Sequence, residues 1–401
     1  MAKWILTGLL IVFHLSVMAQ FVTVKGKEFI GPDGKPLFLK GVNLGNWLLP
    51  EGYMFKFEKA TSPRKIEEVI TELIGPEAAE KFWKAFMDSY IIELDIQQIK
   101  KLGFNSVRVP FNSRLVMNES GPATINEAFF LRMNKLLTWC EKAGLYVIFD
   151  MHGAPGGQTG DNIDDSWGYP YLFTSPDMQE RAIRIWEEFA KRYANRSIII
   201  GYDLLNEPLA HYFNADSLNH TLEPLYRRMT DTIRRYDKNH IIFLGGAQWN
   251  SNFSVFGPPF DDKLAYTFHK YWTPTDVSVI QDYLDFSKKY NVPLWMGESG
   301  ENSDEWVMAF RKTLEANNVP WCFWPYKKMD DTAGPVQFKK PENWDLIVKY
   351  ADGDRSTFKA IRENRPDRQV VIKTLQQYIL NMRAEVCTVN EGYMKALGLM
   401  P

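Results

Sequence analysis

The sequence of 401 residues predicts an α/β fold, a (β/α)₈ TIM barrel that forms one domain with a short helical tail. Short apolar segments rich in β-branched and aromatic residues recur along the chain, and amphipathic stretches separate them. A doubly wound open sheet is the competing fold. It would carry a glycine-rich phosphate loop after its first strand, but the segment GVNLGNW at residues 41–47 lacks that spacing.

Eight segments are expected to form the strands, because each is a short continuous apolar run of the kind found where both faces of a strand are buried. They lie at residues 37–45, 105–111, 145–153, 197–208, 240–249, 264–272, 292–300 and 319–327.

The stretches between these segments have helical periodicity. Residues 126–144 begin at Asn126 and end in Lys-Ala-Gly, which is typical of a helix closed by a C-terminal glycine. Two further helical patterns within residues 50–90 indicate an insertion between the first two strands rather than a separate domain. We therefore predict a barrel domain over residues 20–365 and a helical tail over residues 366–401, which packs on the barrel or stays mobile.

The first residues resemble a secretory signal. Lys3 precedes a long apolar run, and small residues at 17–19 predict cleavage after Ala19, so that residues 1–19 form a signal peptide. The run is too short for a stable membrane span, and no cysteine stands at the cleavage point to carry a lipid. We expect a secreted or periplasmic protein without a membrane span.

Composition narrows the possible partners. A net charge of −2 argues against nucleic acid or an anionic membrane surface, because both require a basic face. The 13 Trp and 18 Tyr residues suit stacking on sugar rings, although core packing accounts for aromatic residues equally well. The three cysteines, Cys140, Cys322 and Cys387, form neither a disulfide framework nor a metal-ligand cluster. Neither a metal nor an organic cofactor is expected.

Polar residues follow or end most of the predicted strands. In a barrel the C-terminal ends of the strands share one rim, which holds the active site, so these residues are expected to meet there. Each one alone has an ordinary explanation as a solvated acid, a structural ion pair, a hydrogen-bonded histidine or a core aromatic residue. Together they predict a site made of Arg108, His152, Asn206, Glu207, His269, Tyr271, Glu298 and Trp324.

Two of these residues are carboxylates that end different strands. A pair of carboxylates flanking one bond is suited to cleaving a glycosidic linkage, with one acid protonated and the other ionised. Pro208 is expected to bias Glu207 towards an extended backbone. Asn206 can bind a sugar hydroxyl, and Arg108 is expected to end the second strand and to hold the pKa of one carboxylate down.

The sequence resembles glycoside hydrolase family 5 over about residues 37–330. The matching motifs run in family order: GVNLGNWL, VRVPF, DMHGAPGGQTG, LLNEP, FHKYW, WMGESG and FWPYK. The resemblance implies a retaining β-glycosidase with Glu207 as acid/base and Glu298 as nucleophile. It implies that Asn206 binds a hydroxyl, that Arg108 and Tyr271 lie near the nucleophile, that His152 and His269 line the rim, and that Trp324 floors the subsite of the cleaved sugar. Ser299 departs from the aromatic residue that often follows the family's nucleophile.

The loop over residues 153–173 most resembles the exo-glucanase branch of that family. On this basis we expect it to wall off one end of the cleft and leave a pocket for a chain terminus. Trp167 in this loop and Trp47 near the first strand are further candidate sugar contacts, with a solvated loop and core packing as the respective alternatives.

The predicted function is therefore a monomeric retaining hydrolase of β-linked glucans or glucosides. The carboxyl groups of Glu207 and Glu298 are expected about 5–5.5 Å apart. An endo-cellulase, a mannanase and a hemicellulose or glycolipid glycosidase remain alternatives, as does a carbohydrate-binding protein without activity. A phosphate-handling barrel would need a glycine-rich loop that the segments after residues 298 and 324 do not resemble.

Overall fold

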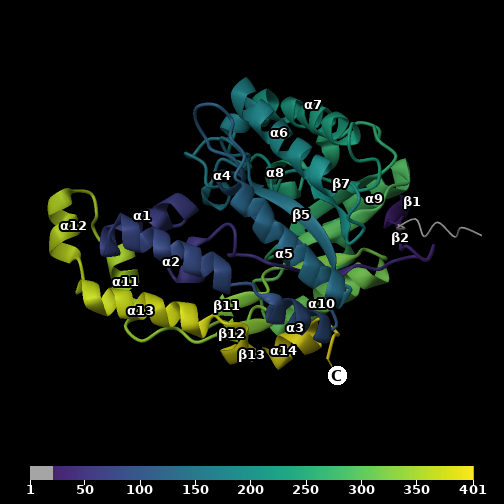
Figure 1. Ribbon diagram of the computed structural model, residues 1–401. Helices are drawn as coiled ribbons and strands as arrows, with labels where there is room; N and C mark the ends of the chain where they lie inside the picture. Colours follow the sequence, from purple (N-terminus) through teal and green to yellow (C-terminus); the bar gives the residue numbers. More distant parts are fainter. Residues whose placement is uncertain (1–20, 401) are drawn as a thin grey trace, which may run out of the picture.

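The computed structural model describes residues 21–400 (Figure 1). The predicted signal peptide, residues 1–19, lies outside the described residues. Eight parallel strands form a closed barrel in the order β10-β3-β4-β5-β6-β7-β8-β9, which confirms the predicted fold. Each predicted segment corresponds to one barrel strand, with β4 ending one residue beyond its segment: β3 (Lys40–Asn43), β4 (Ser106–Asn112), β5 (Tyr146–Gly153), β6 (Ile199–Asp203), β7 (Ile241–Gly245), β8 (Leu264–Lys270), β9 (Leu294–Ser299) and β10 (Trp321–Phe323).

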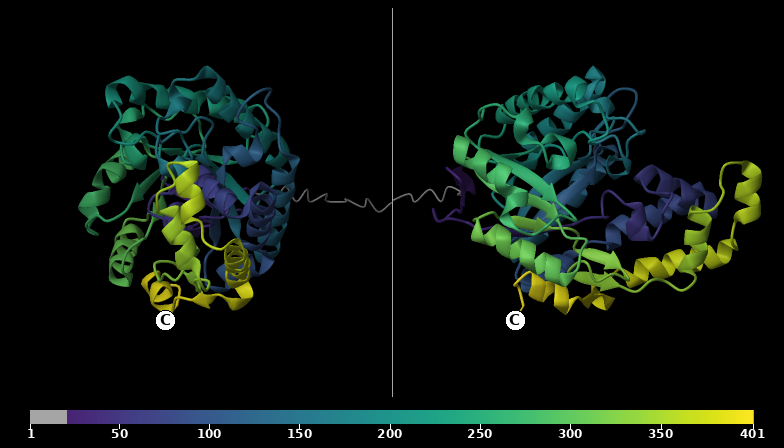
Figure 2. Two further views of the ribbon diagram at one scale, coloured as in Figure 1. Left: turned by 90° about the vertical axis from the view of Figure 1, so that its left-hand side faces the viewer. Right: turned by 180° about the vertical axis from the view of Figure 1, so that it is seen from behind.

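Helices surround the barrel, as expected of alternating strands and amphipathic segments (Figure 2). They are α3 (Glu93–Lys101), α4 (Ser113–Val116), α5 (Glu127–Ala143), α6 (Pro176–Tyr193), α7 (Ala215–Arg234), α8 (Ala247–Asn250), α9 (Gln281–Tyr290) and α10 (Asp304–Ala316). The ends of α5 follow the sequence signals: the Asn126 side chain accepts a hydrogen bond from the backbone N–H of Ala128, and Gly144 adopts a left-handed φ of 63°.

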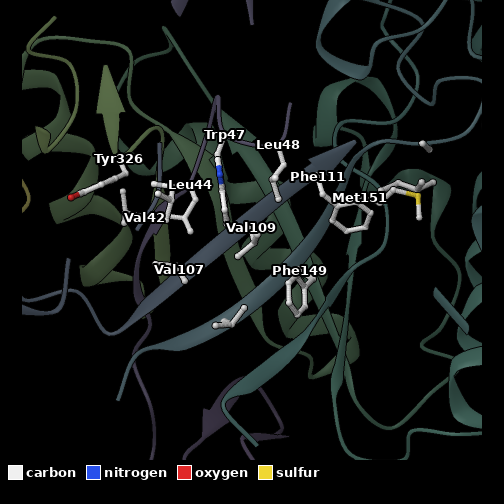
Figure 3. Packing of buried hydrophobic residues seen from close by; sticks show 14 of the residues in the cluster. Val42, Leu44, Trp47, Leu48, Val107, Val109, Phe111, Phe149, Met151 and Tyr326 are labelled. Carbon is white, nitrogen blue, oxygen red and sulfur yellow. The ribbon is translucent and has the colours of Figure 1, made fainter. Parts of the chain in front are cut away.

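Alternation along the strands separates two environments. Odd-numbered residues of β4 and β5, such as Val107, Phe111 and Phe149, pack in the apolar layer beneath the helices (Figure 3). The residues between them face the barrel interior and include Arg108 and Asp150, both fully buried.

The interior of the barrel is apolar at its lower end, where the strands begin. Residues such as Ile148, Phe243 and Trp295 form a second cluster there. The antiparallel hairpin of β1 (Thr23–Lys25) and β2 (Glu28–Ile30) closes this end, since Phe29 stacks on Phe243 at 5.9 Å. Polar groups are therefore concentrated in the upper half of the barrel, beside the C-terminal rim.

A helical extension projects from the barrel (Figures 1 and 2). It joins α1 (Pro63–Ile74) and α2 (Pro76–Ser89) from the predicted insertion to helices from the C-terminal part of the chain, namely α11 (Trp344–Ala351), α12 (Phe358–Asn364) and α13 (Arg368–Asn381). Trp344 and Tyr378 stack at 4.8 Å, and Tyr378 stacks on Phe55 at 5.5 Å.

The C-terminal tail differs from the prediction in its packing. The predicted boundary at residue 365 falls inside the extension, and α13 packs on α1 and α2 rather than on the barrel. After α13, the chain returns to the barrel, where residues 384–386 contact α3 and α14 (Glu391–Ala396) packs on α10. A small sheet of β11 (Lys327–Met329), β12 (Val336–Phe338) and β13 (Thr388–Val389) connects the two regions. The insertion supplies the apolar partner that a separate tail would lack.

No helix among residues 21–400 combines the length and the apolar character needed to cross a bilayer.

Candidate active site

A cavity of about 740 Å³ opens at the C-terminal ends of the barrel strands. Six of the eight predicted rim residues line it, namely His152, Glu207, His269, Tyr271, Glu298 and Trp324. The other two, Arg108 and Asn206, lie directly beneath and are bonded to the lining residues. The structure thus brings together all eight residues that the strand ends predicted.

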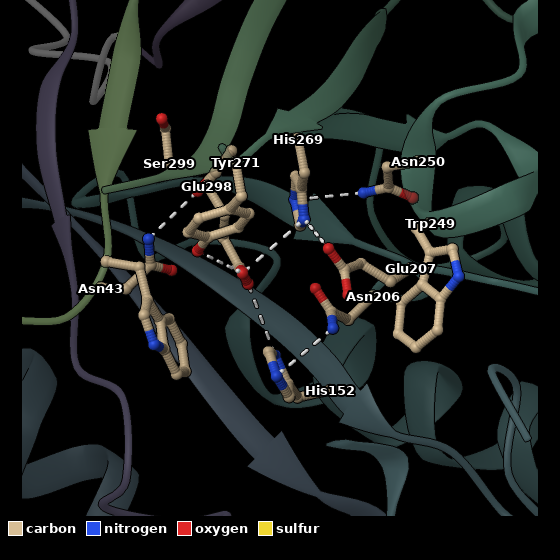
Figure 4. A network of polar contacts seen from close by, with 12 residues as sticks. Asn43, His152, Asn206, Glu207, Trp249, Asn250, His269, Tyr271, Glu298 and Ser299 are labelled. Atoms are coloured by element: carbon tan, nitrogen blue, oxygen red, sulfur yellow. Dashed lines mark hydrogen bonds and ion pairs between the residues drawn. The ribbon is translucent and has the colours of Figure 1, made fainter. Parts of the chain in front are cut away.

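The two carboxylates come from opposite sides of this cavity (Figure 4). Glu298 is a residue of β9, and Glu207 lies in the loop that follows β6. One oxygen of each carboxylate and a ring nitrogen of His269 lie within 4.8 Å of one another. The two carboxylates are therefore close enough to act on a single bond between them.

Arg108 lies deeper than predicted. It is the third residue of β4 rather than its end, and its side chain is fully buried inside the barrel. Its guanidinium donates to the Glu298 carboxylate, to Asp203 Oδ2 at 2.9 Å and to Asn206 Oδ1 at 2.8 Å, and it lies 3.1 Å from Asp150 Oδ1. Arg108 is therefore the shared cationic partner of three buried carboxylates, Asp150, Asp203 and Glu298.

This sharing corrects the expected pKa of Glu298. Burial raises the pKa of Glu298, and the positive charge of Arg108 opposes the rise without reversing it. Burial also raises the pKa of Asp150 and of Asp203 to about 7, again against the effect of Arg108. Arg108 cannot fully neutralise Glu298, because Asp150 and Asp203 draw on the same charge.

The pKa of Glu207 is shifted further from its ordinary value than the pKa of Glu298. Burial, followed by the charge of Glu298, raises the pKa of Glu207 well above its usual range. His269 Nδ1 lies 2.8 Å from Glu207 Oε1, and Asn250 Nδ2 lies 3.1 Å from His269 Nε2. Burial holds the pKa of His269 well below its ordinary value, so the ring is neutral near pH 7. Of the two acids, Glu207 is the one that retains its proton.

The backbone at Glu207 is not extended, contrary to the expectation drawn from Pro208. Its φ is 44°, in the left-handed region that non-glycine residues rarely occupy. Hydrogen bonds from the neighbouring loop outweigh the local preference of a residue before proline, since the Glu207 carbonyl accepts a bond of 2.8 Å from Thr159 Oγ1.

His152 and Asn206 join the two halves of the site. His152 Nδ1 lies 2.7 Å from Asp150 Oδ2, and its Nε2 lies 3.3 Å from Asn206 Nδ2. Burial lowers the pKa of His152 to about 3, so this ring is also neutral near pH 7. The chain of contacts from Asp150 through His152 and Asn206 to Arg108 fixes the orientation of the Asn206 amide.

Tyr271 and Trp324 flank Glu298. The Tyr271 hydroxyl donates to Glu298 Oε2 at 3.1 Å. The Trp324 ring lies parallel to His152, with 5.4 Å between ring centroids, and its Nε1–H donates to the Tyr53 hydroxyl at 2.7 Å. Ser299 points away from the cavity and donates to the Lys270 carbonyl at 2.7 Å, so its departure from the family pattern leaves Glu298 accessible.

Trp47 and Trp167 lie outside this cavity, contrary to the expectation for sugar contacts. Trp47 is buried, and its Nε1–H donates to the Met87 carbonyl at 2.8 Å, which matches core packing. Trp167 is 71% exposed, and the Arg64 guanidinium lies over its ring, 4.5 Å from the ring centroid. The loop over residues 153–173 was expected to wall off one end of the cleft, but only its Ile163 lines the catalytic cavity.

Several lining residues were not predicted from the sequence. They are Glu51, Tyr53, His211, Trp249, Trp272 and Glu301, with Asp150 and Asp203 beneath. Asp150 carried a usable signal, because it lies two residues before His152 on the same face of β5. Asp203 ends β6 and carried a similar signal, whereas the remaining six lie outside the barrel strands, where no strand pattern marks them. Trp249 depends on a turn in which Gln248, Trp249 and Asn250 are all left-handed.

Glu51 is a third buried carboxylate at the cavity. Burial and the charge of Glu298 raise the pKa of Glu51 well above its ordinary value. Among the described residues its carboxylate has no hydrogen-bond partner, so it remains available to a bound hydroxyl.

Within residues 21–400, Glu207, His269 and Glu298 form the one group of three side chains close enough to ligate a metal ion. Arg108 and Tyr271 already occupy the Glu298 oxygens, and His269 contacts Glu207. A site with a guanidinium on its main carboxylate is chemically unsuited to a cation.

Comparison with known proteins agrees with this geometry. Residues 68–330 match the family model described as cellulase, glycosyl hydrolase family 5. The chain is 31% identical over 254 residues to a β-xylosidase from Phanerodontia chrysosporium, covering 63% of this chain and about half (52%) of that protein. It is also 31% identical over 311 residues to endoglucanase C from Acetivibrio thermocellus, covering 62% of this chain and 88% of the relative.

Solved structures share the fold. Endoglucanase Cel5A from Thermotoga maritima superimposes with a TM-score of 0.53 at 19% identity, over 79% of this chain and 97% of that one. An endogalactoceramidase gives a TM-score of 0.62 at 16% identity, over 94% of this chain and 84% of that one. The matched family model covers most of the barrel, both carboxylates included, and the chain belongs to glycosyl hydrolase family 5, a family of β-glycoside hydrolases.

Proposed function

We propose that the protein hydrolyses β-linked glucans or glucosides with retention, by double displacement. The observation that carries this proposal is the short spacing between Glu207 and Glu298, whose nearest oxygens lie within 4.8 Å. Glu298 attacks the anomeric carbon, because Arg108 and Tyr271 stabilise its ionised form. Glu207 gives its proton to the leaving oxygen and then takes one from the water that releases the sugar.

The two carboxylates define two sides of the cavity. The sugar that becomes bound to the enzyme lies over Glu298, against Trp324. The leaving group lies beside Glu207, where His211 and Trp249 line the cavity and the Trp249 Nε1–H donates to His211 Nδ1 at 3.1 Å. Trp249 supplies an aromatic face for the leaving sugar or aglycone.

We also propose exo action, which rests on the side of the cavity near Glu298. Glu301 there accepts bonds from Tyr53 at 3.1 Å and from Lys328 at 2.6 Å, and its carbonyl accepts one from Trp272 at 3.0 Å. This bonded wall stands beyond the sugar that Glu298 attacks and limits how far a chain can extend past it. The proposal includes secretion or export to the periplasm, as the N-terminal segment suggests.

Azide rescue tests the two roles. Glu298→Ala should abolish turnover even of activated aryl glycosides, and azide should restore activity as a glycosyl azide of inverted configuration. Glu207→Ala should keep a fast first step on activated substrates, and azide should give a product of retained configuration. A retained azide from Glu298→Ala would mean that the roles are reversed.

Endo action is the second candidate, because the relatives include endoglucanases. Polymer viscosity followed against reducing-sugar release separates the two modes. Exo action predicts a slow fall in viscosity with single sugars or one short product. A steep early fall with mixed oligosaccharides would establish an open cleft and exclude the closed wall at Glu301.

A further inference from the structure

The backbone that carries Glu207 adopts a conformation that its own sequence disfavours. Glu207 has a φ of 44° and Leu209 a φ of 59°, on either side of Pro208. Such left-handed backbone is unfavourable at a non-glycine residue and persists only where the surrounding structure imposes it. Strand β6 ends at Asp203, so the barrel ladder does not reach this turn.

Two side chains from the loop after β5 impose this conformation. Gln158 is fully buried, and its Nε2 donates to the Asn206 carbonyl at 2.7 Å and to the His152 carbonyl at 2.8 Å. Thr159 is also fully buried, and its Oγ1 donates to the Glu207 carbonyl at 2.8 Å. The Asn206 carbonyl belongs to the peptide before the Glu207 Cα, and the Glu207 carbonyl belongs to the peptide after it.

These two bonds therefore act on the two rotations that define the backbone of Glu207. The angles φ and ψ describe how the two flanking peptide planes turn about the Cα atom. Gln158 holds one plane and Thr159 holds the other, and the backbone N–H groups of Leu209 and Ala210 return bonds to the carbonyls of Gln158 and Thr159 at 2.8 and 3.1 Å.

The loop that presents Gln158 and Thr159 is itself fixed. Asp164 is buried, and its carboxylate accepts backbone bonds from Thr159 at 2.6 Å, Gly160 at 2.8 Å and Ser166 at 2.9 Å. Gly157 turns the chain with a φ of 81°, and a side chain at that position would meet Asp164 Oδ2 at 2.9 Å. These contacts fix the loop conformation that places Gln158 and Thr159 against the Glu207 turn.

We infer that Gln158 and Thr159 are positioning residues for Glu207, which aim its carboxyl at the leaving oxygen by fixing both adjoining peptide planes. This inference rests on the proposed role of Glu207 as acid/base. Neither side chain lines the catalytic cavity, so neither acts on the substrate directly.

The test measures dependence on the leaving group. A misaimed acid costs little when the departing phenol is already a weak base, and costs more as the phenol becomes more basic. For Thr159→Val, which removes the hydroxyl at nearly constant volume, we expect kcat/KM within about twofold of the parent on dinitrophenyl glycosides and about tenfold lower on phenyl glycosides. Thr159→Ser keeps the hydroxyl and should follow the parent across the series.

Gln158→Met is the second variant, and it decides the matter if Thr159→Val does not fold. It removes the Nε2 donor while keeping the length of the side chain, and it should show the same selective loss. An equal loss on all leaving groups would assign both residues a general structural role and overturn the inference.

Glu207→Gln, measured on the same series, separates this inference from the proposed function. If the kcat/KM of Glu207→Gln did not depend on the leaving group, Glu207 would not be the acid and the proposed function would be wrong. If the kcat/KM of Glu207→Gln fell steeply with leaving-group basicity while Thr159→Val and Gln158→Met followed the parent, only the positioning role would be wrong.

Discussion

At the scale of single residues, the site works through unequal stabilisation of two buried acids. Burial raises the pKa of both Glu207 and Glu298, but Arg108 bonds directly to Glu298 and not to Glu207. Tyr271 adds a second donor on Glu298, while a neutral His269 contacts Glu207. The single proton that the pair holds near neutral pH therefore resides on Glu207, which suits an acid, and the charge resides on Glu298, which suits a nucleophile.

Tyr271→Phe tests the contribution of the second donor. Loss of a hydrogen bond to an ionised carboxylate costs about 1.5–3 kcal/mol, so we expect kcat/KM on aryl glycosides to fall by about 10–100-fold. Tyr236→Phe is a matched control, because Tyr236 also donates to a glutamate, Glu187, at 3.0 Å, but on the outer surface of the helices. Equal rates in both variants would show that Tyr271 does not stabilise the nucleophile.

At the scale of elements, the helical extension is built from segments that are distant in sequence. Helices α1 and α2 precede the second barrel strand, whereas α11 to α13 follow the eighth. Arg365 and Arg368 donate to the carbonyls of Leu73 and Ile74 at the end of α1, with distances of 2.9 and 2.7 Å. The extension is therefore held together by contacts between the segment before β4 and the segment after β10.

Trp344→Ala should destabilise this extension strongly. Trp344 is fully buried between Phe57 and Tyr378, and its Nε1–H donates to the Phe55 carbonyl at 2.9 Å. Truncation of such a residue lowers the free energy of unfolding by about 3–5 kcal/mol. Hydrogen exchange should therefore show early loss of protection in α1, α11 and α13. Leu346→Ala on the same helix, 41% exposed, should have little effect. Unchanged protection in α1 would mean that the extension does not depend on this cluster.

At the scale of the whole molecule, the barrel interior has an apolar lower half and a charged upper half. Asp150 and Asp203 are fully buried in the upper half, and burial raises the pKa of each to about 7. In the unfolded chain both would titrate near pH 4. Between about pH 4 and pH 7 the folded protein therefore binds more protons than the unfolded chain, and stability must fall as the pH rises through this range.

The free energy of unfolding should thus decrease between pH 4 and pH 7, by on the order of 1.4 kcal/mol per pH unit for each such carboxyl. Denaturant titrations at several pH values measure this slope, and Asp203→Asn should make it shallower. Asp261→Asn is the control, because Arg234 lowers the pKa of Asp261 below its ordinary value despite partial burial. A slope that Asp203→Asn leaves unchanged would locate the pH dependence elsewhere.

Local sequence patterns were enough to predict the barrel and most of its rim. Short runs buried on both faces favour central parallel strands, and the connections between such strands bring their C-terminal ends to one edge, where Glu207, Glu298 and their neighbours meet. The depth of Arg108 in the barrel, the three acids that share it and the left-handed turn at Glu207 could not be predicted from these patterns. Tertiary structure also placed Trp167 outside the cavity, brought Glu51 and Trp249 into it, and joined α13 to α1 and α2. The physical reason is that local patterns record which face of an element is buried, whereas loop conformation and the sharing of charge depend on contacts between residues far apart in the chain.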